Sequence, residues 1–259
     1  MRNKQFKELA ICGMEAVKSL ERNNPGKIKR FYFNSARAPL FGGLCKRLAA
    51  AKIPYNCVKS DLELQKLCGT VHHQGVVAMI EEPQIANICG EDIRTMVKNK
   101  TPLIYLDGVQ NANNIGAIVR SAAFFGFWTL ILNDSIADEC ITTSTYRIAE
   151  GAMELMKIFC VQNVERLLKD MGDDYCILGF DLQAKKSVRD IKSLCGDKPP
   201  LLIFGNEEVG ISPSVRRLCT ELVKMHGAAK KDAGGKVAVQ SLNVAQAASI
   251  AFYEAAQIR

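Results

Sequence analysis

Three segments in the second half of the chain place polar residues where ordinary packing does not require them. The first segment, Leu106–Gly126, puts Arg120 inside an otherwise apolar helical pattern. A buried guanidinium without a partner is costly, so Arg120 needs a partner or a solvent cleft. An arginine at the helix edge whose head group reaches water fits the same pattern.

The second segment, Leu201–Ser212, reads LLIFGNEEVGIS. Its four leading apolar residues predict a buried strand that ends at Gly205. Ligands of α/β proteins gather at the carboxyl ends of such strands, where a glycine lets a ligand approach the backbone and Glu207 offers a carboxylate. A plain strand–turn–helix with Ser212 as the helix cap explains the segment equally well.

The third segment, Gln240–Val244 (QSLNV), opens the last predicted helix, and Ser241 or Asn243 fits the role of its N-cap. The sequence has neither a G-x-G-x-x-G motif nor a Walker motif, which leaves dinucleotide and nucleoside triphosphate sites without support. Its three histidines lie apart from any cysteine or carboxylate pattern. We therefore expect no metal site.

The elements that must position these segments alternate between strand and helix. This pattern predicts a mainly parallel sheet covered by helices on both faces. The expected strands are Leu103–Leu106, Leu130–Leu132, Ile158–Val161, Cys176–Phe180 and Leu201–Phe204, and the two helices at the polar segments are Asn114–Phe125 and Leu242–Ala256.

The first third of the chain predicts a separate small α/β module. We expect domains over residues 1–82 and 101–259, with a linker over residues 83–100. The expected helices of the module are Leu9–Leu20, Leu40–Ala51 and Asp61–Leu67, and its expected strands are Arg30–Phe33, Tyr55–Val58 and Gly75–Ile80.

Composition favours a folded protein of the cytoplasm. Hydrophobic residues make up 48% of the 259 residues, yet no apolar run is long enough for a membrane span or a signal peptide. The ten cysteines include no C-x-x-C pair, so we expect reduced and mostly buried thiols.

The excess of basic residues lies in the first third of the chain. Residues 1–85 hold 14 basic and 7 acidic residues, whereas the rest hold 20 of each. This surplus suggests a nucleic-acid partner, although a merely soluble basic face has the same composition.

Taken in order, the three polar segments resemble the three motifs of the SpoU/TrmH family, in the SPOUT superfamily of methyltransferases. The first motif, N-x-G-x-x-x-R, is matched by Asn114, Gly116 and Arg120. The second, G-[NA]-E-x-x-G-[ILM], is matched by Gly205, Asn206, Glu207, Gly210 and Ile211. The third, S-L-N-V-S, is matched by Ser241–Val244, with Ala245 in place of the last serine.

The first third is similar to the small substrate-binding module that precedes many such catalytic domains and resembles RNA-binding ribosomal proteins. Gly13 with Ala16 and Val17 carries this likeness at one end, and the run His73–Ala78 carries it at the other. The resemblance therefore extends over nearly the whole chain.

The resemblance implies a trefoil-knot domain that works as a homodimer without a metal. The implied reaction moves a methyl group from S-adenosylmethionine to a ribose 2′-hydroxyl of rRNA or tRNA. A ribose hydroxyl is a poor nucleophile that must be held in line and lose its proton. Arg120 would hold a phosphate or stabilise the developing alkoxide, since arginine is a poor base. The implied orienting residues are Asn114, Glu207, Ser241 and Asn243, and the implied cofactor-binding residues are Phe204, Gly205, Asn206, Gly210, Met225, Leu242 and Val244.

Some positions depart from the family pattern. Asn111-Ala112 stands in place of Asp-Pro, Met225-His226 replaces Ile-Pro, and the loop Ala228–Lys236 is longer than usual. The rival hypothesis is therefore an RNA-binding protein of the same fold that has lost methyl transfer. A third hypothesis, a small-molecule enzyme with a basic accessory domain, predicts no salt-dependent RNA binding.

Overall fold

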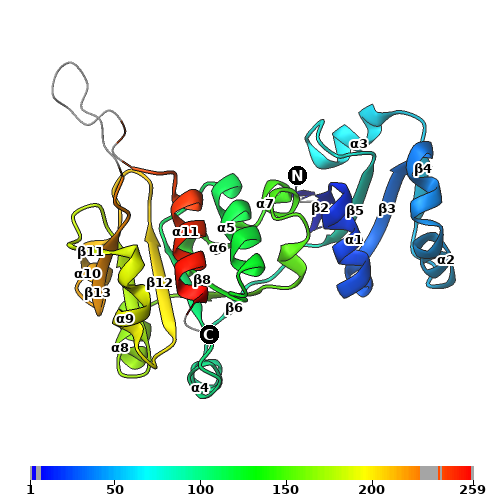
Figure 1. The fold of residues 1–259 in the computed structure, drawn as a ribbon. Coiled ribbons are helices and arrows are strands. Elements are labelled where there is room, and N and C mark those ends of the chain that lie inside the picture. The colour runs from blue at the N-terminus through cyan, green and yellow to red at the C-terminus, as the bar shows by residue number, and fades with distance from the viewer. Residues whose placement is uncertain (1, 4–6, 228–238, 240, 258–259) are drawn as a thin grey trace. The chain divides into compact units, whose positions relative to one another are not determined.

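The computed structural model describes residues 2–3, 7–227, 239 and 241–257, which fall into two compact units (Figure 1). Unit 1 contains the residues up to Gln84 together with Glu139–Met156. Unit 2 contains Ile85–Asp138 together with the residues from Lys157 onward. The chain therefore passes from one unit to the other three times. Within the described residues, no helix is both long and apolar enough to span a membrane.

Unit 1 is built on a five-stranded sheet of order β1-β2-β5-β3-β4. Its pairings are antiparallel except for the parallel pair β3–β4. The strands are β1 (Arg2–Asn3), β2 (Glu8–Cys12), β3 (Ile28–Asn34), β4 (Tyr55–Val58) and β5 (Val76–Glu81). The helices are α1 (Met14–Asn23), α2 (Gly42–Ala50), α3 (Asp61–Cys68) and α7 (Thr143–Ile148), with 3₁₀ turns at Pro25–Lys27, Ser35–Leu40 and Ala152–Glu154.

The prediction of one helix over Leu9–Leu20 is wrong, because its first part is strand β2. The break falls at Gly13, whose φ of 97° belongs to the left-handed region that favours glycine. Leu9–Cys12 is a continuous buried run that pairs with β5. Such short apolar runs fit a buried strand as well as one face of a helix, which is why their period is ambiguous.

The family-like run at His73–Ala78 has an architectural role in unit 1. The side-chain oxygen of Gln74 accepts a hydrogen bond from the backbone nitrogen of Met14, at 2.6 Å, where α1 begins. Buried His73 accepts one through Nδ1 from the backbone nitrogen of Gly75, at 3.0 Å. Gly75 has a φ of 82°, and a Cβ there would lie 2.7 Å from the side-chain nitrogen of Asn34. These residues therefore join the start of β5 to the start of α1.

The segment Glu139–Met156 belongs with unit 1, although the sequence places it inside the second predicted domain. Ser19 Oγ donates to the carbonyl oxygen of Gly151 at 2.7 Å. The buried carboxylate of Glu154 accepts from Asn24 Nδ2 at 2.6 Å and pairs with Lys27 Nζ at 3.2 Å. The segment is therefore fastened to α1 and to the 3₁₀ turn that follows it.

Unit 2 contains an eight-stranded sheet of order β11-β13-β10-β12-β7-β8-β9-β6, and all its strand pairings are parallel. The expected parallel sheet is thus confirmed. The strands are β6 (Ala86–Asn87), β7 (Leu103–Asp107), β8 (Thr129–Asn133), β9 (Lys157–Val161), β10 (Cys176–Phe180), β11 (Lys186–Ser187), β12 (Pro200–Gly205) and β13 (Glu221–Lys224).

Helices of unit 2 cover the sheet, because its central strands are buried at nearly every position and therefore on both faces. Leu103, Tyr105 and Ile203 pack with residues of α4, α8 and α10 in one core cluster. Helix α11 packs against β12, α5 and α9. The helices are α4 (Gly90–Lys98), α5 (Ala112–Phe124), α6 (Asp134–Cys140), which crosses the unit boundary, α8 (Val164–Met171), α9 (Ile191–Cys195), α10 (Pro213–Arg216) and α11 (Val244–Ala256), with a 3₁₀ turn at Val188–Asp190.

The stretch expected to be a linker, residues 83–100, contains strand β6 and helix α4. Strand β6 pairs with β9 at the edge of the unit 2 sheet. Helix α4 buries Met96 and packs Ile93 and Val97 against the core. The three apolar side chains share one face of α4, at spacings of three and four residues. This short helical pattern was not predicted from the sequence, because Pro83 suggested a linker.

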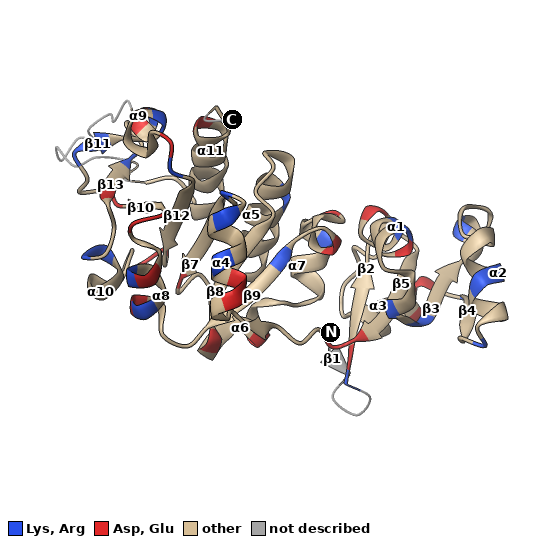
Figure 2. Ribbon diagram, turned by 90° about the horizontal axis from the view of Figure 1, so that it is seen from below, with Lys and Arg blue, Asp and Glu red and all other residues tan. Residues whose placement is uncertain are grey.

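Charge is less segregated between the folded units than between the parts of the sequence. Unit 1 contains 15 basic and 10 acidic residues, and unit 2 contains 19 and 17. The difference from the sequence estimate arises because Glu139–Met156 brings three glutamates and one arginine into unit 1. Figure 2 shows basic residues on α2 of unit 1 and on α8, α9 and α10 of unit 2.

Candidate functional site

The site lies at the carboxyl edge of the parallel sheet, where β7 and β12 are neighbours. Asp107 at the end of β7 stands in register with Gly205 at the end of β12. From β7 the chain builds the sheet outward through β8 and β9, and then crosses to the other side of β7 to add β10 and β12. Such a reversal of strand order is where ligands bind in open α/β sheets.

The loop after β12 is held tightly by its own backbone and by Asn206. The backbone nitrogen of Asn206 donates to the carbonyl oxygen of Gly210 at 3.1 Å, and the reverse bond is 2.9 Å. Asn206 Oδ1 accepts from the backbone nitrogens of Glu208 and Val209, and Asn206 Nδ2 donates to the carbonyl oxygen of Gly108 at 3.0 Å. The side chain of Asn206 is therefore occupied in shaping the loop that carries Glu207.

Gly205 has no room for a side chain. A Cβ there would lie 2.2 Å from the carbonyl carbon of Gly210, so any larger residue would push the loop away from the strand end. Gly210 itself has a φ of 72°. These two glycines are needed for close backbone approach and for a left-handed conformation.

Residues from all three sequence motifs meet in one hydrogen-bonded chain. Asn114 Nδ2, in the first turn of α5, donates to Glu207 Oε1. Asn243 Nδ2, before α11, donates to Asn114 Oδ1 at 3.0 Å. Asn114 thus joins a carboxylate 93 residues further along the chain to an amide 129 residues away. Nothing in local chain packing requires such a link.

The two asparagines that begin α5 and α11 also act as helix caps. Asn111 Oδ1 accepts from the backbone nitrogen of Asn113 at 2.9 Å, and Asn243 Oδ1 accepts from that of Ala245 at 2.8 Å. The helices are joined further along by a 2.7 Å bond from Ser249 Oγ to Ser121 Oγ. Asn111 thus fixes the start of α5 although the family's Asp-Pro is absent. Asn243 performs capping and network roles together.

Arg120 is exposed and stands on another face of α5 from Asn114. Six residues at 3.6 per turn separate the two by about 120° around the helix axis. Ser121 lies about two turns after Asn114 and accepts a hydrogen bond from Ser249 of α11. Exposed Phe124 lies one turn after Arg120 and on the same face. The structure therefore brings Asn114, Glu207 and Asn243 together, and Arg120 lies on a different face of α5.

The residues expected to hold the cofactor occupy three loops at the same edge, with one exception. Phe204 is buried in the core, where its ring stacks on that of Phe180 at 4.5 Å, so only its backbone is available. Half-buried Met225 follows β13, and half-buried Val244 begins α11. Ser241 and Leu242, which precede Val244 in the third motif, are exposed. The longer loop Ala228–Lys236 lies outside the described residues.

The exposed apolar residues of this edge fit an adenosyl group. Val209 is 82% exposed and Leu242 is 47% exposed, so each loop presents a large apolar side chain that the protein itself leaves uncovered. A Cβ built on Gly210 meets no atom within 4 Å, so its backbone can be approached closely. Apolar side chains combined with accessible backbone groups are what an adenine ring and an amino acid tail require. Among the described residues, no cluster of side chains is suited to hold a metal ion.

Asp107, the last residue of β7, also holds the site in place, and it was not among the predicted site residues. Asp107 Oδ2 accepts from the backbone nitrogen of Ser212 at 2.7 Å, which ties β7 to the chain beyond the Glu207 loop. Burial, together with the charge of Asp107, raises the pKa of the Tyr105 hydroxyl. An aspartate directly after a buried strand was the available signal.

Comparison with known proteins assigns this arrangement to a family. A profile of the SpoU rRNA Methylase family matches residues 101–253, which include all three motifs. The chain belongs to this family. A second profile, described as RNA 2′-O ribose methyltransferase substrate binding, matches residues 10–86. The expected family assignment is thus confirmed for both parts of the chain.

Relatives of this SpoU family member are similar over different shares of their length. The 23S rRNA (guanosine-2′-O-)-methyltransferase RlmB of Nitrosomonas europaea is 26% identical, covering 94% of this chain and 89% of the relative. RlmB of Bordetella pertussis is 26% identical over 96% and 97% of the respective chains. An uncharacterized tRNA/rRNA methyltransferase of Haemophilus influenzae is 25% identical over 66% of this chain, and the match spans only 47% of that relative.

Solved structures show the same fold. The SpoU methyltransferase AviRb from Streptomyces viridochromogenes, in complex with AdoMet, superposes with a TM-score of 0.71 at 22% identity, covering 98% of this chain and 91% of that one. An AdoMet-bound rRNA methyltransferase from Sinorhizobium meliloti gives 0.70 at 19% identity, covering 98% and 88%. The expected α/β architecture is thereby confirmed.

Proposed function

We propose that this SpoU family member transfers a methyl group from S-adenosylmethionine to a ribose 2′-hydroxyl of ribosomal RNA. The observation that carries the proposal is the hydrogen-bonded chain Glu207–Asn114–Asn243, which unites three motifs at a ligand-binding edge. The substrate class is supported by the names of the RlmB relatives that this chain matches nearly end to end. Transfer RNA is the second candidate, as the mixed name of the Haemophilus influenzae relative suggests.

S-adenosylmethionine would supply an electrophilic methyl group on its sulfonium sulfur. The backbone of Phe204, Gly205, Asn206 and Gly210 would hold it together with Met225, Leu242 and Val244. Glu207, held by Asn114, would accept a hydrogen bond from the ribose and fix its orientation. Ser241 would contribute a further hydrogen bond from the loop that carries Asn243. Orientation of this kind supplies much of the rate enhancement in group transfer between two bound molecules.

Arg120 would stabilise the alkoxide that develops on the ribose or hold the adjacent phosphate. A guanidinium stays protonated, so electrostatic stabilisation suits it better than proton removal. Because Arg120 and Asn114 lie about 120° apart around the axis of α5, we propose that Arg120 serves the site of a second subunit. A homodimer would thereby complete each site.

An apolar surface on α5 and α11 supports the homodimer. Phe124 is 83% exposed, and Ile250 and Tyr253 are also exposed. Phe125 links them, with ring centroids 5.1 Å from Phe124 and 6.1 Å from Tyr253. A contiguous apolar patch of this kind indicates an interface, and it includes the face of α5 that carries Arg120. We further propose that the segments from β12 to α11 form the trefoil knot of the superfamily.

Unit 1 would bind the RNA, as the substrate-binding description of its matching profile suggests. Its excess of basic over acidic residues supports contacts with phosphates, and such contacts weaken as salt rises. Residues 1–84 and Glu139–Met156 would then bind RNA, and residues 85–138 and 157–259 would carry out methyl transfer.

Calorimetric titration with S-adenosylmethionine and S-adenosylhomocysteine, followed by methyl transfer to total RNA, tests the proposal. We expect binding of both and a methylated ribose identified in digested rRNA by mass spectrometry. A folded protein that binds RNA but neither transfers methyl groups nor binds the cofactor in the presence of RNA would instead be the inactive RNA-binding protein. Methylation of tRNA and not of rRNA would show that tRNA is the substrate, and the proposed reaction would stand.

A further inference from the structure

Two pairs of cysteines have thiols close enough to affect each other's ionisation. Cys12 pairs with Cys68 in unit 1, and Cys176 pairs with Cys195 in unit 2. All four cysteines are buried and in the free thiol form. The proposed methyl transfer uses neither pair, so their chemistry is open to a separate interpretation.

Cys12 and Cys68 join two elements of the unit 1 core. Cys12 is the last residue of β2, and Cys68 is the last residue of α3. Both belong to one buried cluster that also contains Leu64, Val77 and Met79. Because they come from distant parts of the sequence, a bond between them would fasten the end of α3 to the sheet.

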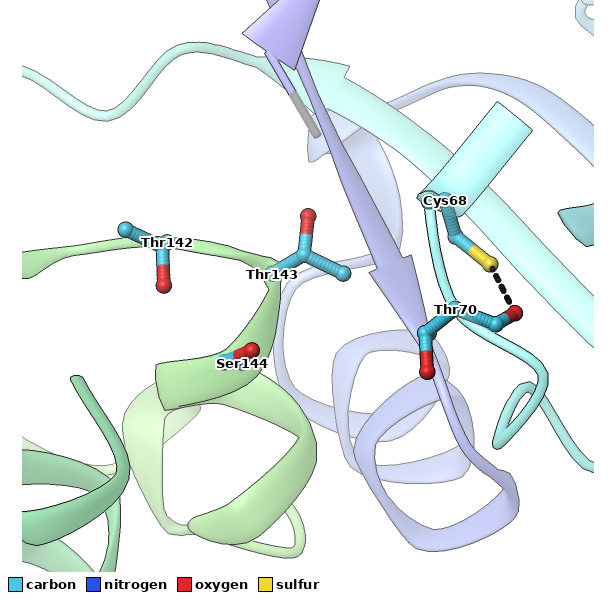
Figure 3. Close-up of a pocket in the computed structure, with 6 residues that line it drawn as sticks. Cys68, Thr70, Thr142, Thr143 and Ser144 are labelled. Carbon is cyan, nitrogen blue, oxygen red and sulfur yellow. Dashed lines mark hydrogen bonds between the residues drawn. The ribbon is translucent and has the colours of Figure 1, made fainter. Parts of the chain in front are cut away.

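Cys68 also lines an open pocket of about 380 Å³ within unit 1. Figure 3 shows Cys68 and Thr70 on one side of this pocket and Thr142, Thr143 and Ser144 on the other. Cys68 Sγ donates to the carbonyl oxygen of Thr70 at 3.4 Å. A small polar oxidant that enters the pocket therefore meets Cys68 first, and fully buried Cys12 is its neighbour in the core.

The two thiols differ in their access to the pocket. Cys68 lines it, whereas Cys12 is fully buried in the core. The proximity of Cys12 lowers the pKa of the Cys68 thiol, and Cys68 together with burial raises the pKa of Cys12. A thiolate is the reactive form of cysteine, so Cys68 is placed to react with an oxidant and Cys12 to act second.

We propose that Cys12 and Cys68 form a reversible disulfide when a hydroperoxide enters the pocket. The thiolate of Cys68 attacks one peroxide oxygen, the O–O bond breaks, and a sulfenic acid forms with release of hydroxide or an alkoxide. Cys12 sulfur then attacks the Cys68 sulfur, the S–O bond breaks, and the Cys12 proton leaves in water. The two thiols are oxidised by two electrons and the peroxide is reduced. A dithiol reductant reverses the step by exchange.

The test uses the full-length wild-type protein, so that it does not depend on the folding of a variant. After treatment with hydrogen peroxide and blocking of free thiols, it is digested without reductant. Trypsin needs to be combined with a glutamate-specific protease, because one tryptic peptide carries both Cys68 and Cys89, and cleavage after Glu81 or Glu82 separates them. We expect a peptide pair linked through Cys12 and Cys68 that dithiothreitol removes.

Two results would overturn the proposal. One is oxidation of exposed Cys57 to completion with no link between Cys12 and Cys68. The other is a Cys176–Cys195 link that forms first, which would show that the pocket gives no preference. A Cys12→Ser variant adds a second readout, since Cys68 without a resolving thiol should proceed to sulfinic acid. Cys57→Ser is the matched control and should retain the link.

Discussion

The two units use their conspicuous polar residues for opposite purposes. In unit 1, Gln74, His73 and Ser19 bond to backbone groups and hold elements of the fold in place. In unit 2, Asn114, Glu207 and Asn243 bond side chain to side chain at the carboxyl edge of the sheet. A motif residue bonded to backbone indicates architecture, whereas one bonded to another motif residue indicates chemistry. Substitutions should therefore affect stability in unit 1 and turnover in unit 2.

The largest effect on turnover is expected for Arg120→Ala. Loss of a group that stabilises developing charge typically lowers kcat by about 10²-fold or more. The residue is exposed, so the melting temperature should stay within a degree or two of wild type, since surface substitutions change stability by about 0.5 kcal/mol or less. Single-turnover methyl transfer and thermal unfolding measure the two quantities. Unchanged turnover would remove Arg120 from the mechanism.

Glu207→Ala should lower kcat by a smaller factor, about 10- to 100-fold, since it orients groups and does not face developing charge. Glu207→Gln is the matched control, because its amide oxygen can still accept from Asn114 Nδ2. We expect the glutamine variant to retain more activity than the alanine variant. Equal losses in both would indicate that the negative charge, and not the hydrogen bond, is the property that matters.

Asn243→Asp separates the two roles of this residue. The aspartate keeps an acceptor for the backbone nitrogen of Ala245 but cannot donate to Asn114. Turnover should fall about tenfold with little loss of stability, whereas Asn243→Ala should also lose about 1 kcal/mol of helix-cap stabilisation. Chemical denaturation compared with initial rates tests this difference. A destabilised aspartate variant would show that the network itself supports the fold.

Gly75→Ala should destabilise unit 1 by about 1–3 kcal/mol and leave kcat for methyl transfer unchanged. Its φ of 82° is unfavourable for alanine, and the new methyl would contact Asn34. Gly196→Ala is the control, because it also has a positive φ, 53°, but meets no atom within 4 Å. Denaturant midpoints should therefore fall further for Gly75. A similar fall in both would attribute the effect to backbone strain alone.

Ser19→Ala should have the smallest effect, about 1 kcal/mol, since it removes one buried hydrogen bond to Gly151. Hydrogen exchange of residues 139–156 should rise, while kcat should stay at the wild-type value. An effect on kcat with no change in exchange would mean that this segment contributes to chemistry and not only to the fold of unit 1.

The sequence was sufficient for elements whose pattern is unambiguous. Tyr55–Val58 and Cys176–Phe180 were located without error, because short runs bounded by polar or turn residues have clear ends. Strand β13 was missed because Glu221 and Lys224 enclose only two apolar residues. The site was recognised through motif order, since no local property of Asn114 shows that it reaches Glu207. The membership of Glu139–Met156 in unit 1 depends on long-range contacts that no local pattern records.

The placement of Glu139–Met156 has a consequence for synthesis of the protein on the ribosome. Domains generally fold as units as the chain emerges, beginning from the N-terminus. Unit 1 cannot follow this order. Ser19 bonds to Gly151, and Asn24 and Lys27 bond to Glu154, and both partners are translated only after strands β7 and β8. Until residue 154 has been translated, α1 and the turn after it lack these contacts, and neither unit of the nascent chain can complete its fold. Codon usage or pausing around residue 156 would thus affect the yield of folded protein more than the same change near residue 84.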